Sequence, residues 1–164
     1  MKNNKLFIML LLVSEMAFTY CKPEEQGGKD TPLPMLIKND SAEHVHEYTV
    51  IVSAKNWRRV NCSERFVDIP IEEITGSVLD EGLVMIYLTE GNKYIALPFN
   101  YYQVRRILSF QPSFEPGHAY ISIYGNFITN VSARYEFKLL IVSKEILKNE
   151  RNRNWNDFNA LKKK

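Results

Sequence analysis

Three histidines have the spacing of a metal site. His44 and His46 are two residues apart, so an extended chain turns both imidazoles to one face, and His118 is a third candidate ligand. Zinc sites need three or four converging ligands of this kind. His44 and His46 lie at the edge of a segment without apolar periodicity, which favours solvated histidines. No metal and no other cofactor are expected.

Two pairs of neighbouring acids, Glu72-Glu73 and Asp80-Glu81, are the second chemical feature. A glycosidase uses two carboxyl groups that flank the scissile bond, and these residues are the candidates for such a pair. Adjacent acids more often mark a solvated surface. The sequence contains no Gly-x-Ser-x-Gly elbow, no glycine-rich phosphate loop and no Cys/His nucleophile arrangement. A non-catalytic protein is therefore predicted, with a hydrolase as the alternative.

Residues 1–21 have the pattern of an export signal. Lys2 and Lys5 precede an unbroken apolar run, Leu6 to Val13, which is too short for a membrane-spanning helix of ~20 residues and suits a secretory signal. Phe18-Thr19-Tyr20-Cys21 resembles a bacterial lipobox. The prediction is a signal peptide over 1–20 and lipidation of Cys21 with palmitate-type chains. Because Tyr20 is large for a lipobox, cleavage after Thr19 to a secreted or periplasmic protein is the alternative.

The next segment, residues 21–46, is predicted to be a flexible, lipid-anchored tether, because it lacks apolar periodicity and is interrupted by prolines and glycines. Lys22-Pro23-Glu24-Glu25 resembles the lysine-plus-acidic signal of Bacteroidetes lipoproteins that reach the cell surface. Asp40-Ser41-Ala42 fits the short O-glycosylation pattern of the same phylum, at Ser41. The expected location is the outer membrane, with the surface-facing and periplasm-facing orientations both open.

Size and charge set further limits. Removal of residues 1–20 from the 164 leaves 144, which is one domain plus its tether. The same cleavage removes Lys2, Lys5 and Glu15, so the formal charge falls from +2 to +1, and no nucleic-acid partner is expected. Cys62 is the only other cysteine. With Cys21 lipidated, Cys62 is predicted to be a buried small hydrophobe outside any intramolecular disulfide.

Residues 47–164 are predicted to form a single antiparallel β-sandwich. About seven short strands with frequent turns are typical of that fold, and Glu90-Gly91-Asn92 predicts a hairpin turn. A short helical turn is expected near 75–81, and a short C-terminal helix over 157–163 is expected to dock through Trp155. The predicted strands span residues 48–54, 66–69, 83–89, 93–98, 103–110, 118–124 and 135–142.

Aromatic side chains are concentrated between Phe99 and Phe127. Tyr101 and Tyr102 are adjacent, so in a strand they point to opposite faces and one of them should be exposed. Phe114 lies in a loop flanked by prolines. Tyrosine combines apolar area with a polar tip and suits binding surfaces. Tyr101, Tyr102 and Phe114 are therefore the predicted binding edge.

The order of several motifs resembles the small lipoproteins of unknown function found in Bacteroidetes. The resemblance covers about residues 48–161 and rests on Val52–Trp57, Ile74–Gly82, Ala96–Phe99, Tyr135–Lys138 and Asp157-Phe158. It implies a β-sandwich in the cell envelope and no catalytic assignment. We therefore expect a non-catalytic envelope lipoprotein that contacts the membrane through Cys21 and binds a glycan or an envelope protein. The alternative is a secreted or envelope hydrolase, and the sequence does not indicate an oligomeric state.

Overall fold

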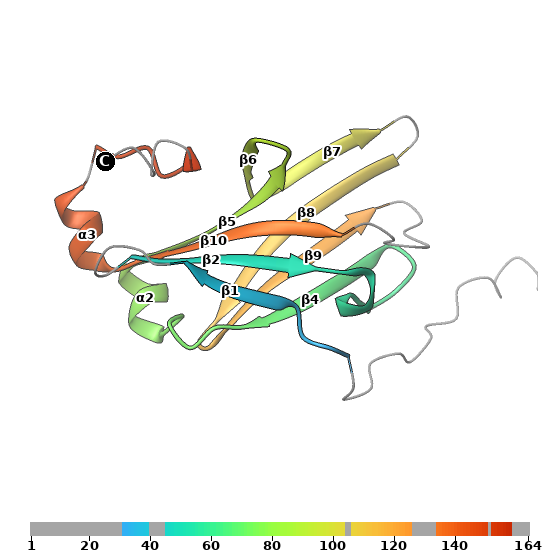
Figure 1. Ribbon diagram of the computed structural model, residues 1–164, viewed down its shortest axis with the longest axis horizontal. Coiled ribbons are helices and arrows are strands. Elements are labelled where there is room, and N and C mark those ends of the chain that lie inside the picture. The colour runs from blue at the N-terminus through green and yellow to red at the C-terminus, as the bar shows by residue number, and fades with distance from the viewer. Residues whose placement is uncertain (1–30, 40–44, 104–105, 126–133, 151, 159–164) are drawn as a thin grey trace, which may run out of the picture.

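The computed structural model describes residues 31–39, 45–103, 106–125, 134–150 and 152–158. These residues form two antiparallel five-stranded sheets, layered one on the other (Figure 1). Sheet A has the order β1 (Met35–Asn39), β2 (Val45–Val52), β10 (Tyr135–Val142), β5 (Leu83–Glu90), β6 (Lys93–Ala96). Sheet B has the order β3 (Arg58–Arg59), β4 (Glu64–Pro70), β9 (His118–Gly125), β8 (Arg106–Glu115), β7 (Phe99–Gln103). The predicted β-sandwich is confirmed, with β1, β3 and β7 in addition to the expected strands.

The core lies between the sheets and follows from the period-2 pattern of the strands. In β9, Ala119, Ile121 and Ile123 are buried, while the residues between them point outward. Trp57 is buried in this core, as expected for a ring between sheets, and packs edge-on against Tyr135 with ring centroids 6.1 Å apart. The large apolar side chains thus keep the two sheets together.

Two local predictions are confirmed. The β5–β6 hairpin turns at Gly91-Asn92, where Gly91 has a φ of 59° that favours glycine. The helical turn is α2 (Gly76–Glu81), and the Thr75 hydroxyl caps it by accepting a hydrogen bond from the Val78 amide at 3.3 Å. α2 connects β4 of sheet B to β5 of sheet A. A second connection runs from β2 to β3 through the 3-10 turn η1 (Ala54–Asn56).

The strand predicted over 103–110 corresponds to the first half of β8, and only Gln103 belongs to the preceding strand β7. β7 pairs with the first half of β8, from Arg106 to Phe110. β8 then continues to Glu115 and pairs only with β9 along that second half. Pro112 fits there because no β7 residue lies opposite it, so its missing N–H removes no bond on that side. The turn to β9 comes at Gly117, whose φ is 82°.

The ordered domain begins earlier than residue 47. Residues 35–39, which belong to the expected 21–46 tether, form β1, and β2 already begins at Val45. The residues just before β1 are also bound to the domain, because the Asn56 side chain donates hydrogen bonds to the carbonyls of Pro32 (2.8 Å) and Leu33 (3.0 Å). The apolar triplet at 35–37 is therefore a strand and not linker. Cys21, Ser41 and His44 lie outside the described residues.

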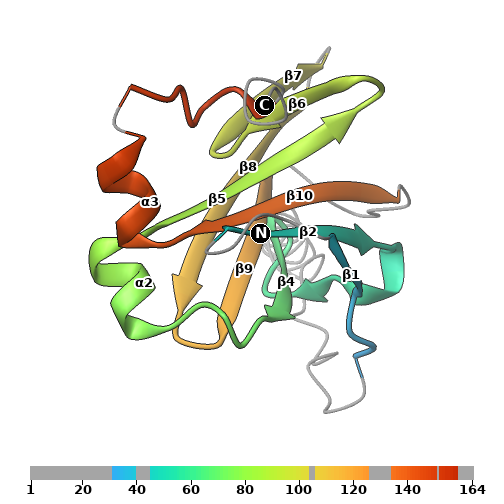
Figure 2. The same cartoon turned by 60° about the vertical axis from the view of Figure 1, so that its left-hand side comes forward.

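A C-terminal segment covers part of the outer face of sheet A. It begins with α3 (Lys144–Asn149), a helix absent from the prediction, and runs back toward β6 (Figure 2). Its Phe158 is buried against Tyr87 and Tyr94, with ring centroids 5.0 and 4.5 Å apart. The Tyr87 hydroxyl donates a hydrogen bond to the carbonyl of Trp155. Most of the helix predicted over 157–163 falls on residues outside the described part.

Candidate ligand-binding face

The structure separates the histidines that suggested a metal site. His46 lies in β2 of sheet A and His118 in β9 of sheet B. His118 Nδ1 is 2.8 Å from Asp68 Oδ1, on the neighbouring strand β4. Within the described ranges, no group of three or more histidine, cysteine or acidic side chains could hold a metal ion. His118 thus has a local partner on its own sheet.

In each acid pair, one carboxylate forms an ion pair with a lysine and the other is exposed. Glu73 forms an ion pair with Lys38 at 2.5 Å, and Glu81 forms one with Lys144. Glu72 and Asp80 are exposed. Burial raises the pKa of Glu73, but hydrogen bonds from Lys38 and Tyr48 outweigh burial and lower it to about 2. A general acid of a glycosidase needs the opposite shift, so this arrangement gives Glu73 a structural role.

Only two of the three predicted binding residues lie near each other. Tyr101 is opposite Leu108 and turns toward the core side of sheet B, whereas Tyr102 is opposite Ile107 and points outward. Their opposite orientations follow the alternation expected of adjacent strand residues. Phe114 is six residues along β8 from Leu108, or roughly 20 Å away, and is half-buried against the core. It does not belong to the same site.

The outer face of sheet B carries an exposed patch around Tyr102. Tyr102 is 72% exposed and Ile107, directly opposite it, is 49% exposed. Tyr124 is also exposed and lies opposite Ser109, two residues along β8 from Ile107 on the same face. Cross-strand and diagonal neighbours are close enough for long side chains to touch the same ligand.

The patch continues along β9 toward His118. Tyr120 points to the same face as Tyr124, four residues away, so the two rings start roughly 13 Å apart. The rings of His118 and Tyr120 are stacked, with centroids 5.9 Å apart and planes 8° from parallel. Burial and the nearby carboxylates of Asp68 and Glu115 raise the pKa of Tyr120. Its hydroxyl therefore stays protonated.

Short polar side chains separate the rings. The cross-strand partners place hydroxyl and carboxamide groups between the tyrosines on this outer face. We call the surface the tyrosine face; it comprises Tyr102, Ile107, Ser109, Gln111, Ser113, His118, Tyr120, Ser122, Tyr124 and Asp68. Sequence reasoning missed Tyr120 and Tyr124 as site residues. The period-2 pattern of 118–124, with small or branched apolar residues at every second position, is the signal that could have found them.

A small pocket opens on the other side of β7. It has a volume of about 240 Å³ and is lined by Leu88, Thr89, Glu90, Tyr101, Leu108, Phe110 and Tyr135. Burial and the neighbouring Tyr101 raise the pKa of Tyr135. The pocket is below the usual volume of a small-molecule site, about 300 Å³ or more. It adjoins β7, the strand that also carries Tyr102, but lies on the opposite side of that strand from the tyrosine face.

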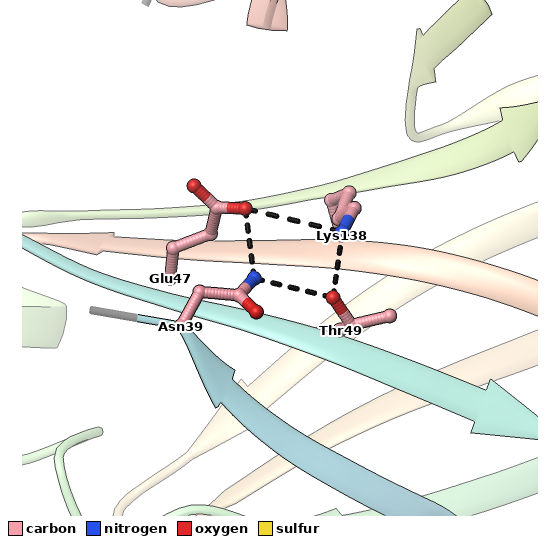
Figure 3. Close-up of polar contacts among 4 residues, drawn as sticks. All are labelled: Asn39, Glu47, Thr49 and Lys138. Carbon is pink, nitrogen blue, oxygen red and sulfur yellow. Dashed lines mark hydrogen bonds and ion pairs between the residues drawn. The ribbon is translucent and has the colours of Figure 1, made fainter. Parts of the chain in front are cut away.

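The outer face of sheet A carries a different, closed polar cluster (Figure 3). Lys138 Nζ donates to Thr49 Oγ1 at 2.6 Å and lies 3.9 Å from Glu47. The Asn39 amide donates to Glu47 at 2.8 Å and to Thr49 at 3.2 Å. The four side chains come from β1, β2 and β10 and satisfy one another. This cluster ties three strands together and leaves the tyrosine face as the better candidate site.

Cys62 departs from its prediction. It is half-buried, receives a contact from Arg59 Nη2 at 3.5 Å and is disulfide-bonded. The expectation of a buried small hydrophobe outside any disulfide is therefore wrong.

Comparisons with known proteins add no relative: no family model, curated protein or solved structure matches the chain. In the described ranges, no helix is long and apolar enough to cross a membrane.

Proposed function

We propose that this protein is a non-catalytic, lipid-anchored binding module of the bacterial outer membrane, and that the tyrosine face binds a glycan. The observation that carries the ligand class is the open outer face of sheet B, where exposed tyrosines alternate with hydroxyl and carboxamide side chains. The membrane anchor rests on Cys21 and on the resemblance of the motifs to Bacteroidetes lipoproteins.

The chemistry of the face favours a sugar chain. A pyranose ring has an apolar C–H face and a rim of hydroxyls, and tyrosine offers a flat ring with a polar tip. Ser109, Gln111 and Ser122 supply donors and acceptors beside the rings. Serine is depleted in protein–protein interfaces, so this composition fits a glycan better than an envelope protein. The spacing between Tyr120 and Tyr124 fits an extended ligand of several units.

One observation favours the alternative of an unanchored secreted or periplasmic protein. Cys62 is disulfide-bonded, and the sequence contains one other cysteine, Cys21. A Cys21 thiol used in a disulfide is not available for a lipid thioether. The anchor and the glycan site are therefore separate parts of the proposal, and each needs its own experiment.

Affinity electrophoresis through gels that contain soluble polysaccharides tests the glycan site. We expect at least one neutral polysaccharide to retard the protein, and Tyr102→Ala and Tyr124→Ala to weaken the retardation about tenfold, as for central interface aromatics. Tyr102→Phe keeps the ring and should retain most of the effect. Leu33→Ala, at an exposed residue outside the face, is the control. Retardation that is unchanged in both alanine variants contradicts the site, and a panel without any retardation contradicts the ligand class.

A further inference from the structure

The small pocket beside β7 lies between the two sheets and is separate from the tyrosine face. Because adjacent strand residues point to opposite sides, Tyr101 turns into this pocket while Tyr102 points out to the tyrosine face. Both sheets contribute side chains to the lining: Leu88 and Glu90 from β5, Tyr135 from β10, Tyr101 from β7, and Phe110 from β8. The pocket is therefore a second candidate site with its own chemistry.

Glu90 carries the charge of this pocket. Leu88, two residues earlier on β5, is buried in the core, so the alternation of the strand turns the Glu90 side chain to the same inner side. Phe137 lies opposite Leu88, and the same register two residues further along places Tyr135 beside Glu90. Glu90 is exposed, so its carboxylate lies at the mouth of the pocket. Of the lining residues, Glu90 alone is charged at neutral pH, and this charge attracts cations and repels anions.

The Glu90 carboxylate is open to a ligand. Lys93 lies directly opposite Glu90 in the β5–β6 hairpin, and both residues are exposed. Within the part of the chain that the structure describes, neither side chain forms an ion pair or a hydrogen bond. An incoming cation can therefore pair with Glu90 without first breaking a contact, although it competes with the nearby charge of Lys93.

Aromatic rings form the walls of the pocket behind this carboxylate. The ring centroids of Phe110 and Tyr135 are 5.4 Å apart and the ring planes are 69° from parallel, so the two rings meet as the sides of a corner. Tyr101 supplies a third ring. Phe110 is 2% exposed and Leu88 7% exposed, so they form a closed apolar floor. The negative face of an aromatic ring attracts an ammonium ion within about 6 Å of its centroid, most strongly where water is excluded.

We propose that this pocket binds a small organic ammonium ion, with the cationic nitrogen between the rings and next to the Glu90 carboxylate. The volume of about 240 Å³ is below that of a site for drug-sized ligands and suits a nitrogen that carries a few short carbon substituents. The rings and the carboxylate both favour a cation over a neutral molecule of the same shape, and Glu90 disfavours an anion of that shape. This site is additional to the proposed glycan face and lies on the other side of sheet B.

The test uses three compounds of similar shape and different charge. They are choline, its neutral isostere with carbon in place of nitrogen, and the anion tert-butylacetate. NMR titration of the purified mature protein, in detergent if it carries lipid, should show saturable choline binding with a dissociation constant on the order of a millimolar. The shifted signals should come from residues that line the pocket. The neutral isostere should bind about tenfold more weakly, and the anion should show no saturable binding.

Variants separate the contributions of the charge and the rings. Glu90→Gln keeps the shape of the side chain and should weaken choline binding about threefold, as for an exposed ion pair. Tyr101→Leu removes one ring and should weaken choline binding about fivefold. Tyr102→Leu, the matched change on the opposite side of β7, should leave choline binding unchanged. Lys93→Gln removes the competing charge and should tighten choline binding about twofold. Thermal unfolding should confirm that each variant is folded.

Three results would overturn the proposal: no saturable binding of choline, equal affinity for choline and its neutral isostere, or choline binding that is indifferent to both Glu90→Gln and Tyr101→Leu. Retardation by polysaccharides reports on the outer face of sheet B. The outcome for the pocket and the outcome for the glycan face are therefore independent.

Discussion

Lys38 and Glu73 form an ion pair, 2.5 Å from Nζ to Oε1, between the edge strand of sheet A and the loop that leads from β4 to α2. Tyr48 of β2 completes the contact: burial and its hydrogen bond with Glu73 raise the pKa of Tyr48 to about 12. Two consecutive strands, β1 and β2, thereby meet a loop that lies more than twenty residues further along the chain at one carboxylate. The contact also holds β1 in place beside β2.

This carboxylate predicts a pH-dependent stability. The pKa of Glu73 falls from its ordinary 4.5 to about 2 in the folded protein, so folding favours the ionised form. Its contribution is complete above about pH 5 and is lost as the pH falls toward 2. At pH 7, Glu73→Gln should cost about 1 kcal/mol, less than the full shift because the group is partly exposed. Urea unfolding from pH 7 to pH 3 should show this difference shrink.

Glu72→Gln is the control for that series, because the neighbouring Glu72 is exposed. It should change the free energy of unfolding little at any pH. A Glu73→Gln difference that is constant between pH 7 and pH 3 would contradict the assigned role of the ion pair.

Gly82 predicts a steric requirement at the end of α2. A Cβ added there would lie 2.6 Å from the Val142 carbonyl oxygen and 2.8 Å from the Val78 carbonyl oxygen, both backbone atoms. Gly82→Ala should therefore destabilise the protein by about 2 kcal/mol. Gly76→Ala, where a Cβ meets nothing within 4 Å, should be neutral or stabilise by up to about 1 kcal/mol, since alanine is the better helix former. Thermal unfolding of the two variants checks this, and equal midpoints would refute the steric argument.

Phe158 predicts how the C-terminal segment is held. Its ring is 1% exposed between Tyr87 and Tyr94, so Phe158→Ala should cost about 3 kcal/mol. The same change should expose the segment from α3 onward to limited proteolysis. Tyr87→Phe removes only the hydroxyl that binds the Trp155 carbonyl and should cost about 1 kcal/mol. If proteolysis cuts Phe158→Ala no faster than Tyr87→Phe, the ring is not the anchor.

The membrane anchor predicts a chemical modification. Intact-mass analysis of membrane-extracted protein should find acyl chains on Cys21, and Cys21→Ala should lose both the added mass and the membrane association. Two or three chains give stable anchoring, at ~0.8 kcal/mol per buried methylene. An unmodified product cut after Thr19, with a disulfide between Cys21 and Cys62, would contradict the anchor and establish the secreted alternative.

Much of the fold was readable from local patterns. The two-residue turn at Gly91-Asn92, the Thr75 cap and the period-2 pattern of 118–124 each act within a few residues, so the sequence alone indicates their structure. β10 shows a feature that a local sequence pattern cannot predict. Its pattern changes from alternating to wholly apolar because Leu140 and Val142 point outward but are covered by the C-terminal segment. No pattern within β10 identifies that cover.

For the predicted binding residues, too, one feature followed from local sequence and another depended on contacts between distant strands. Alternation alone predicts that Tyr101 and Tyr102 point to opposite faces, and the structure places them so. Whether Phe114 shares a site with them depends on the register and length of β8, which the neighbouring strands decide.

The sequence by itself determined the strand-rich fold class, the hairpin turn and the helical turn, because each depends on short-range chemistry. Only the tertiary structure decided that residues 35–39 join a sheet, that Glu73 meets Lys38, and that Tyr120 and Tyr124 share an open face with Tyr102. These are contacts between distant segments. Their existence depends on which strands become neighbours, and the packing of the whole sandwich selects that order.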